Sequence, residues 1–265
     1  MARVAEGLND PGAAEVTRAR QRAPMLEVAV LHPRDVAGAD EGGADRLVVF
    51  ADPEADPEAG GRSPEPSVVS SVCKGTDVAV RVVLRLSDGF STTGAEVTRL
   101  LGLAEDYLAV GASGLVFGFL DLDLEVDVEP CLALAGQLRG VPWTFSRAID
   151  SSLAPERAWR QMSGLPGLDS VLSAGSPQGM GTGFDDLIRL AESDERVASL
   201  LVAGGGLRAE QVPWLVRAGV TAFHLGSSAR QDGSWSKAYV DAGRVRSWRM
   251  LLDDAAGLAA GLRPA

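Results

Sequence analysis

The chain has 265 residues and a formal net charge of −11, with 36 acidic against 25 basic residues. Affinity for nucleic acid comes mainly from clustered Lys and Arg, so this balance excludes DNA and RNA as expected partners. Hydrophobic residues make up 46% of the chain and aromatic residues only 5%, a composition typical of buried parallel strands flanked by helices. The length suits one α/β barrel, a fold that commonly has about 250 residues.

The N-terminal segment differs from the rest of the chain. Residues 1–24 mix arginines with acidic residues and contain no apolar run of the kind found in signal peptides. We expect them to form a flexible tail in front of a single domain at 25–265. No later segment has the roughly 20 apolar residues needed to cross a bilayer, and Cys73 and Cys131 form no disulfide framework or CxxC motif. We therefore predict a cytoplasmic protein.

From residue 26 onward, short apolar runs alternate with longer segments of helical period, as in repeated βα units. Their spacing of about 25 residues predicts a closed (β/α)8 TIM barrel of parallel strands. A doubly wound open sheet is the main alternative, but its first βα turn would be expected to contain GxGxxG, whereas this chain has LHPR at 31–34. The runs begin near Leu26, Arg46, Val78, Gly114, Pro142, Ser170, Ser199 and Ala222.

The loops after the seventh and eighth runs are rich in glycine and serine. Glycines let backbone N–H groups approach an anion closely, and a helix that begins near Arg208 would direct its positive end to the same point. These two loops are the usual phosphate position in TIM barrels. The alternative is that the glycines only form tight turns. The predicted anion-binding residues are Gly204, Gly205, Gly206, Arg208, Gly226, Ser227 and Ser228.

The loop after the fourth run is acidic, with four carboxylates between Asp121 and Asp127. Alternation of these residues with Leu and Val predicts an extended segment in which Asp121 and Asp123 project to the same side. There they could bind a hard cation. The alternative is a solvated turn that caps the following helix, with Asp127 at the N-cap.

Three further charged residues are candidates for catalysis. Arg147 and Asp150 follow the fifth run and can meet across their loop, either to orient a substrate anion or simply to pair with each other. Glu27 lies within the first run, and a carboxylate that points into a barrel is costly unless it is paired or functional. If Glu27 points outward, it is only a surface charge.

The two histidines, His32 and His224, have no His, Cys or acidic residue at metal-ligand spacing. The sequence also lacks a Ser-His-Asp order and a nucleophile elbow. A single histidine in a strand is more often a core residue than a ligand or a switch. We therefore expect His224 to be part of the core.

Six segments of the chain form a distinctive set: LEVAV at 26, GADRLVVFAD at 43, GGRSP at 60, GLVFGFLDLDLEVD at 114, WTFSRAID at 143 and AGGGLRAEQV at 203. Together they resemble the CutC family, which is associated with copper homeostasis. The resemblance covers roughly residues 25–230 and implies a cytoplasmic TIM barrel that binds copper, the one cofactor suggested. The matching positions around the mouth are Glu27, Arg85, Asp121, Asp123, Arg147, Asp150 and Arg208.

The chain also departs from the family pattern. Family members usually have cysteines just after the first-strand glutamate and at the end of the second strand, where this chain has Ala29, Val30 and Phe50. The family's second-strand glutamate is Val48 here, and the histidine before the fifth-loop arginine is Ser146. Because soft Cu(I) prefers sulfur ligands, these changes remove the groups that would bind it best.

Three functions remain open. The first is copper handling of the CutC type, which is binding rather than catalysis. The second is an enzyme or sensor for a small phosphorylated or carboxylated metabolite, with Glu27 or Asp150 as general acid or base. In that case Arg85, Arg147 or Arg208 would hold the anion. The third is a degenerate barrel that serves as an interaction partner. The predicted partner is a small-molecule anion or a metal ion, with a homodimer as an open alternative.

Overall fold

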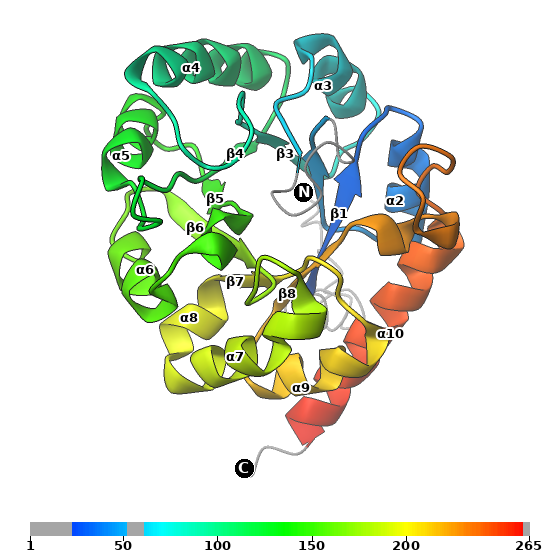
Figure 1. The fold of residues 1–265 in the computed structure, drawn as a ribbon. Coiled ribbons are helices and arrows are strands. Elements are labelled where there is room, and N and C mark those ends of the chain that lie inside the picture. Colours follow the sequence, from blue (N-terminus) through cyan, green and yellow to red (C-terminus); the bar gives the residue numbers. More distant parts are fainter. Residues whose placement is uncertain (1–22, 52–60, 262–265) are drawn as a thin grey trace, which may run out of the picture.

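The computed structural model describes residues 23–51 and 61–261. Eight parallel strands close into a barrel in the order of the sequence, and β1 pairs with β8 to complete it. Figure 1 shows the strands as an inner ring and the helices as an outer ring. The predicted single (β/α)8 barrel is confirmed. The flexible tail predicted at residues 1–24 lies outside the described residues, apart from the last two.

The strands are short and the helices between them vary in length. The strands are β1 (Met25–Val30), β2 (Arg46–Val49), β3 (Ala79–Val83), β4 (Gly114–Phe117), β5 (Trp143–Phe145), β6 (Leu168–Ser173), β7 (Leu201–Ala203) and β8 (Ala222–Leu225). The α-helices are α2 (Asp35–Gly42), α3 (Pro66–Cys73), α4 (Gly94–Ala109), α5 (Val128–Gln137), α6 (Pro155–Met162), α7 (Met180–Ser193), α8 (Glu195–Leu200), α9 (Val212–Arg217) and α10 (Ala242–Gly261). Short 3-10 helices are η1 (Arg147–Ser151), η2 (Ala209–Gln211), η3 (Ser227–Ala229) and η4 (Gln231–Gly233).

The barrel has two apolar regions because its strands are buried on both faces. The larger region lies between the strands and the outer helices. A smaller one lies inside the barrel and consists of Ala29, Val48, Phe50, Val83 and Val116. These five residues stand on the first four strands or directly after them, so they form an apolar floor below the C-terminal ends of the strands.

Buried charged side chains occupy the part of the barrel interior nearer the start of the strands. Glu27 is fully buried, Arg46 and Arg81 are almost fully buried, and all three stand on β1, β2 and β3. Arg81 bonds the hydroxyl of Thr144 and the carboxylate of Asp169. Charged groups are stable inside a barrel only when they are paired in this way.

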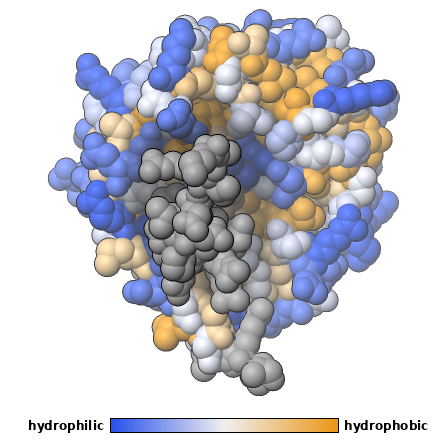
Figure 2. All heavy atoms as spheres, turned by 180° about the vertical axis from the view of Figure 1, so that it is seen from behind, coloured by the Kyte–Doolittle hydropathy of each residue, from blue (hydrophilic) through white to orange (hydrophobic). Residues whose placement is uncertain are grey.

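The opposite end of the molecule is seen in Figure 2. Hydrophilic residues project around the rim of this view, whereas hydrophobic residues gather in its upper right part. Within the described ranges, no helix is both long and apolar enough to cross a membrane.

Candidate functional site

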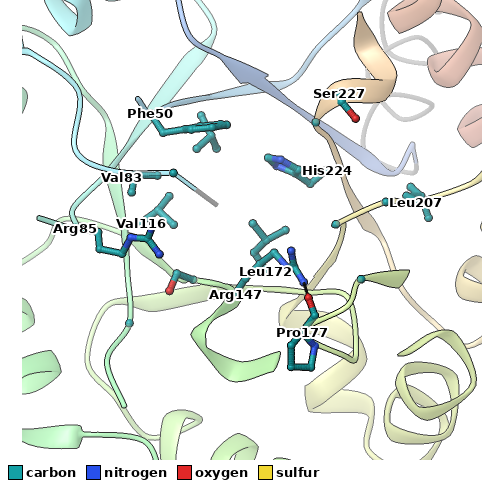
Figure 3. Close-up of a pocket in the computed structure, with 18 of the residues that line it drawn as sticks. Phe50, Val83, Arg85, Val116, Arg147, Leu172, Pro177, Leu207, His224 and Ser227 are labelled. Carbon is teal, nitrogen blue, oxygen red and sulfur yellow. Dashed lines mark hydrogen bonds between the residues drawn. The ribbon is translucent and has the colours of Figure 1, made fainter. Parts of the chain in front are cut away.

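A cavity of about 320 Å³ opens at the C-terminal ends of the strands and is called the mouth cavity below. Its floor is the apolar region inside the barrel, extended by Leu172 of β6 (Figure 3). Its polar lining comes from β8 and from the loops that follow β3, β5, β6, β7 and β8, as expected for a TIM barrel. The polar and glycine lining includes Arg85, Ser146, Arg147, Gln178, Gly205, Gly206, His224, Gly226, Ser227 and Ser228.

Three nitrogen-bearing side chains point into the mouth cavity from different sides. Figure 3 shows Arg85 and His224 on opposite sides of it and Arg147 between them. The guanidinium of Arg85 also lies over the ring of Phe90, 5.7 Å from its centroid. Both arginines are less than a tenth exposed. Two partly desolvated cations in a cavity with an apolar floor favour an anionic ligand.

Arg147 is held in place by the residues around its loop. Its Nε donates to Asp150 at 2.8 Å, and its Nη2 donates to the carbonyls of Ser176 and Pro177 at 3.1 and 3.2 Å. Its Nη1 makes no hydrogen bond within the described part of the chain. The predicted pairing of Arg147 with Asp150 is therefore present, and it leaves one terminal nitrogen available to a ligand.

Asp150 is buried and surrounded by donors. Its carboxylate accepts from Arg147, from the hydroxyl of Ser173 at 2.6 Å and from the backbone N–H groups of Ala174 and Gly175. Burial raises its pKa, although Arg147 and Ser173 act in the opposite direction. Asp150 does not line the mouth cavity. Its place in the structure is that of a group that positions Arg147 and the β6 loop.

Glu27 points into the barrel and contacts two nitrogen-bearing side chains. Its Oε2 accepts from Nε of Arg46 at 2.5 Å, and its Oε1 lies 2.7 Å from Nδ1 of His224. Burial by itself would raise its pKa, but the charge of Arg46 and the bond with His224 outweigh burial and lower the pKa to about 2. The carboxylate is therefore ionised at neutral pH, and it contacts the mouth cavity through His224.

His224 is the functional candidate that the sequence analysis missed. It was expected to be a core residue, but it stands on β8 beside Glu27 and lines the mouth cavity. Phe223 and Leu225 on either side of it are fully buried in the outer core. The alternation of side chains along the strand could have indicated this position. Neighbouring residues of a strand point to opposite faces, so the residue between two outward apolar side chains faces the barrel interior.

The glycine-rich loops account for most of the predicted anion site. Gly205, Gly206, Gly226, Ser227 and Ser228 line the mouth cavity, and their binding of an anion stays a prediction. Gly205 and Gly206 have positive φ values of 80° and 87°, which only glycine adopts readily. Gly204 lies behind them, where an added Cβ would meet His224 at 2.7 Å.

Arg208 does not belong to the mouth cavity. Its side chain is 61% exposed and pairs with Glu210 at 3.2 Å. The helix expected to begin there is the three-residue 3-10 helix η2, followed by the short α9. Arg208 stands in the loop after β7, but its side chain is exposed outside the mouth cavity, so its part in anion binding stays a prediction.

The acidic loop after β4 is a turn rather than an extended segment. Oδ1 of Asp121 accepts from the backbone N–H groups of Asp123 and Glu125, each at 2.9 Å. Both Asp121 and Asp123 are exposed and lie outside the mouth cavity. Within the described residues, no group of three or more His, Cys, Asp or Glu side chains could hold a metal ion. A metal site at Asp121 and Asp123 stays a prediction without a third ligand.

The two cysteines are free and stand on separate helices of the outer ring. Cys73 is the last residue of α3, and Cys131 is fully buried in α5. Burial raises the pKa of both thiols, that of Cys131 to about 12. Neither thiol lines the mouth cavity.

Comparison with known proteins identifies relatives that match more than three quarters of this chain. A family protein CutC of Klebsiella pneumoniae is 31% identical over 211 residues, which are 78% of this chain and 81% of that protein. The human copper homeostasis protein cutC homolog is 30% identical over 213 residues, 78% of this chain and 75% of that protein.

Solved structures share the fold at lower identity. A CutC protein from Streptococcus agalactiae has a TM-score of 0.66 at 20% identity, over 77% of this chain and 98% of that chain. Thiamine phosphate pyrophosphorylase from Pyrococcus furiosus has a TM-score of 0.57 at 16% identity, over 89% and 98%. The model of the CutC family matches residues 24–229, so this chain belongs to the CutC family.

Proposed function

We propose that this CutC-family barrel binds a small organic anion, a phosphorylated or carboxylated metabolite, in the mouth cavity. One observation carries the proposal: Arg85, Arg147 and the glycine-rich loops after β7 and β8 line the same cavity, above an apolar floor. The arginines offer donors that match carboxylate and phosphate oxygens. The floor offers contact to a carbon skeleton.

The size of the mouth cavity also supports a small ligand. Its volume of about 320 Å³ lies at the lower end of the range of roughly 300–1,000 Å³ for small-molecule sites. Backbone N–H groups of residues 205–206 and 226–228 can approach an anion without side-chain obstruction. The loops after β7 and β8 are also the common phosphate-binding position of this fold.

Copper is the second candidate, because the human relative is named for copper homeostasis. Among the described residues, the donors that line the mouth cavity include one imidazole, from His224, and no sulfur. Cu(I) prefers thiolate or thioether ligands. This donor set does not fit Cu(I) as a cargo, so the anion is the better supported ligand.

Two further proposals concern the cellular location of the protein and its oligomeric state. We propose a reducing, cytoplasmic location, which the two free thiols support. A homodimer also stays a proposal.

The anion proposal is tested with Arg147→Gln. Isothermal calorimetry would measure the affinity for phosphate and for small phosphorylated and carboxylated compounds. The variant should bind at least about tenfold more weakly, because a hydrogen bond to a charged group contributes about 1.5–3 kcal/mol.

Arg208→Gln is the matched control, since it removes the same charge from a nearby loop but outside the mouth cavity. It should bind as the wild type does. Equal affinity of both variants, or no anion binding by the wild type, would contradict the proposal.

A further inference from the structure

We propose that His224 is the proton-transfer residue of the mouth cavity, and that the protein is an enzyme acting by general acid–base chemistry on its bound anion. This inference rests on the proposed anion binding and names its chemistry. The geometry that carries it is a chain of three side chains, Arg46, Glu27 and His224, which runs from the barrel interior to the cavity wall.

Glu27 fixes the orientation of the imidazole. The carboxylate lies 2.7 Å from Nδ1 of His224 and is itself held by Arg46 at 2.5 Å. An ionised carboxylate only accepts hydrogen bonds, so Nδ1 is the donor and carries the proton of the neutral ring. Nε2 then has a free lone pair. Within the described residues it makes no hydrogen bond, and His224 lines the mouth cavity.

A carboxylate behind a histidine is the arrangement that prepares imidazole for proton transfer. The carboxylate holds one tautomer and stabilises the imidazolium that forms when Nε2 takes a proton. Here the carboxylate is fully buried, so water does not compete for it. A core histidine without a role would not require a buried ion pair at its back, because burying charge is costly.

The other charges around His224 make its protonation depend on the ligand. From β1, Glu27 favours the imidazolium, and Arg46 of β2 and Arg81 of β3 lie behind that carboxylate. Arg85 and Arg147 line the same cavity, and their positive charges disfavour the imidazolium. An anion between the two arginines and the ring would offset their charge. Anion binding should therefore promote proton uptake by His224.

The step itself balances without an oxidant or reductant. A proton leaves a C–H or O–H group of the ligand for Nε2, and the bonding electron pair stays on the ligand. The resulting imidazolium lies between the carboxylate of Glu27 and the anionic ligand. Return of the proton to the same or a neighbouring atom restores the neutral ring. The substrate class is a carboxylated or phosphorylated metabolite with an acidic hydrogen.

The first test reads the tautomer of the ring by nitrogen NMR. The chain has two histidines, so His32→Gln leaves His224 as the single signal. His32 lies outside the mouth cavity, and its Nδ1 accepts from the N–H of Arg34. We expect the neutral ring to carry its proton on Nδ1. A ring protonated on Nε2 would overturn the proposal, because it could not accept a proton from the ligand.

The second test couples the ring to an anion, with sulfate as the probe because its charge is constant near neutral pH. On binding of saturating sulfate, the nitrogen signals of His224 should move toward those of the imidazolium, and sulfate should bind more tightly as the pH is lowered from about 8 to about 6. In His224→Gln, sulfate should still bind but lose this pH dependence. The His32→Gln background should keep it.

The outcomes separate the two proposals. Sulfate binding that leaves the nitrogen signals of His224 unchanged would overturn the role of His224 while the anion site stands. A failure of the wild type to bind sulfate, phosphate or carboxylates would overturn the anion site and, with it, this proposal.

Discussion

At the scale of single residues, the barrel interior shows how a buried carboxylate acquires a fixed charge. Glu27 has no contact with solvent, and desolvation alone would keep it protonated. Arg46 and His224 reverse this outcome and lower its pKa to about 2. The partners that lower this pKa are in place only in the native state, so the carboxylate links stability to pH.

This linkage predicts a loss of stability in acid. The pKa of Glu27 falls from 4.5 to about 2 on folding, so its contribution is complete above pH 4.5 and is lost as the pH falls toward 2. The expected loss is roughly 3 kcal/mol. Denaturant unfolding of the wild type and Glu27→Gln between these pH values measures it.

Comparison of the two proteins isolates Glu27 from Asp150, whose raised pKa acts in the opposite direction. Glu27→Gln should be less stable at neutral pH, because Arg46 loses its partner. Its stability should also depend less steeply on pH below 4.5. Equal pH slopes for both proteins would show that Glu27 is not the group responsible.

Single residues were also where sequence reasoning was weakest. The position of Glu27 inside the first strand left open whether it points inward, paired or functional, or outward as a surface charge. The structure places it inside the barrel, beside Arg46 and His224. The partner His224 is 197 positions away, so no local spacing indicated it. Arg208 was assigned to the anion site from the composition of its loop. Composition does not determine which way a loop side chain points, and Arg208 is exposed outside the mouth cavity.

At the scale of elements, the sequence predicted the strands far better than the loops. Every strand begins within two residues of its predicted start, because each is a buried apolar run bounded by turn residues. The start of β7 was predicted two residues too early, at Ser199, because α8 extends to Leu200 and β7 begins only at Leu201. The extended conformation predicted for the loop after β4 is wrong. The side chain of Asp121 accepts from the backbone N–H groups of Asp123 and Glu125, and such a local turn competes with an extended chain.

The loop after β7 gives a matched pair of substitutions. Gly205 and Gly206 have similar positive φ values, so alanine at either position costs about 1–2 kcal/mol in backbone strain. A Cβ at Gly205 would also lie 3.0 Å from the guanidinium carbon of Arg147 and 2.9 Å from Ala174, whereas at Gly206 its nearest neighbour is 4.0 Å away. Gly205→Ala should therefore be the less stable variant and should displace Arg147.

Chemical denaturation of both variants tests this difference, and calorimetry with phosphate tests the displacement. Phosphate affinity should fall in Gly205→Ala even where the protein stays folded. Equal stabilities would mean that backbone strain alone governs this loop and that Arg147 moves without cost.

At the scale of the whole molecule, the barrel and its ligand chemistry follow different constraints. Closure depends on buried Val, Leu and Ala, and these are present although identity with the CutC relatives is only about 30%. Copper chemistry depends on a few donor atoms. The positions expected to carry cysteine in the family hold Ala29, Val30 and Phe50, two of which contribute to the apolar region inside the barrel.

The final prediction is that this protein binds Cu(I) much more weakly than a CutC relative that has cysteines at those positions. Cys73 and Cys131 belong to α3 and α5, and α4 packs between these helices. Their raised pKa values keep both as thiols, and the thiolate is the form that binds metal. Competition with a Cu(I) chelator measures the affinity. Tight stoichiometric binding that survives Cys73→Ser and Cys131→Ser would show that other ligands, away from the mouth cavity, hold the metal.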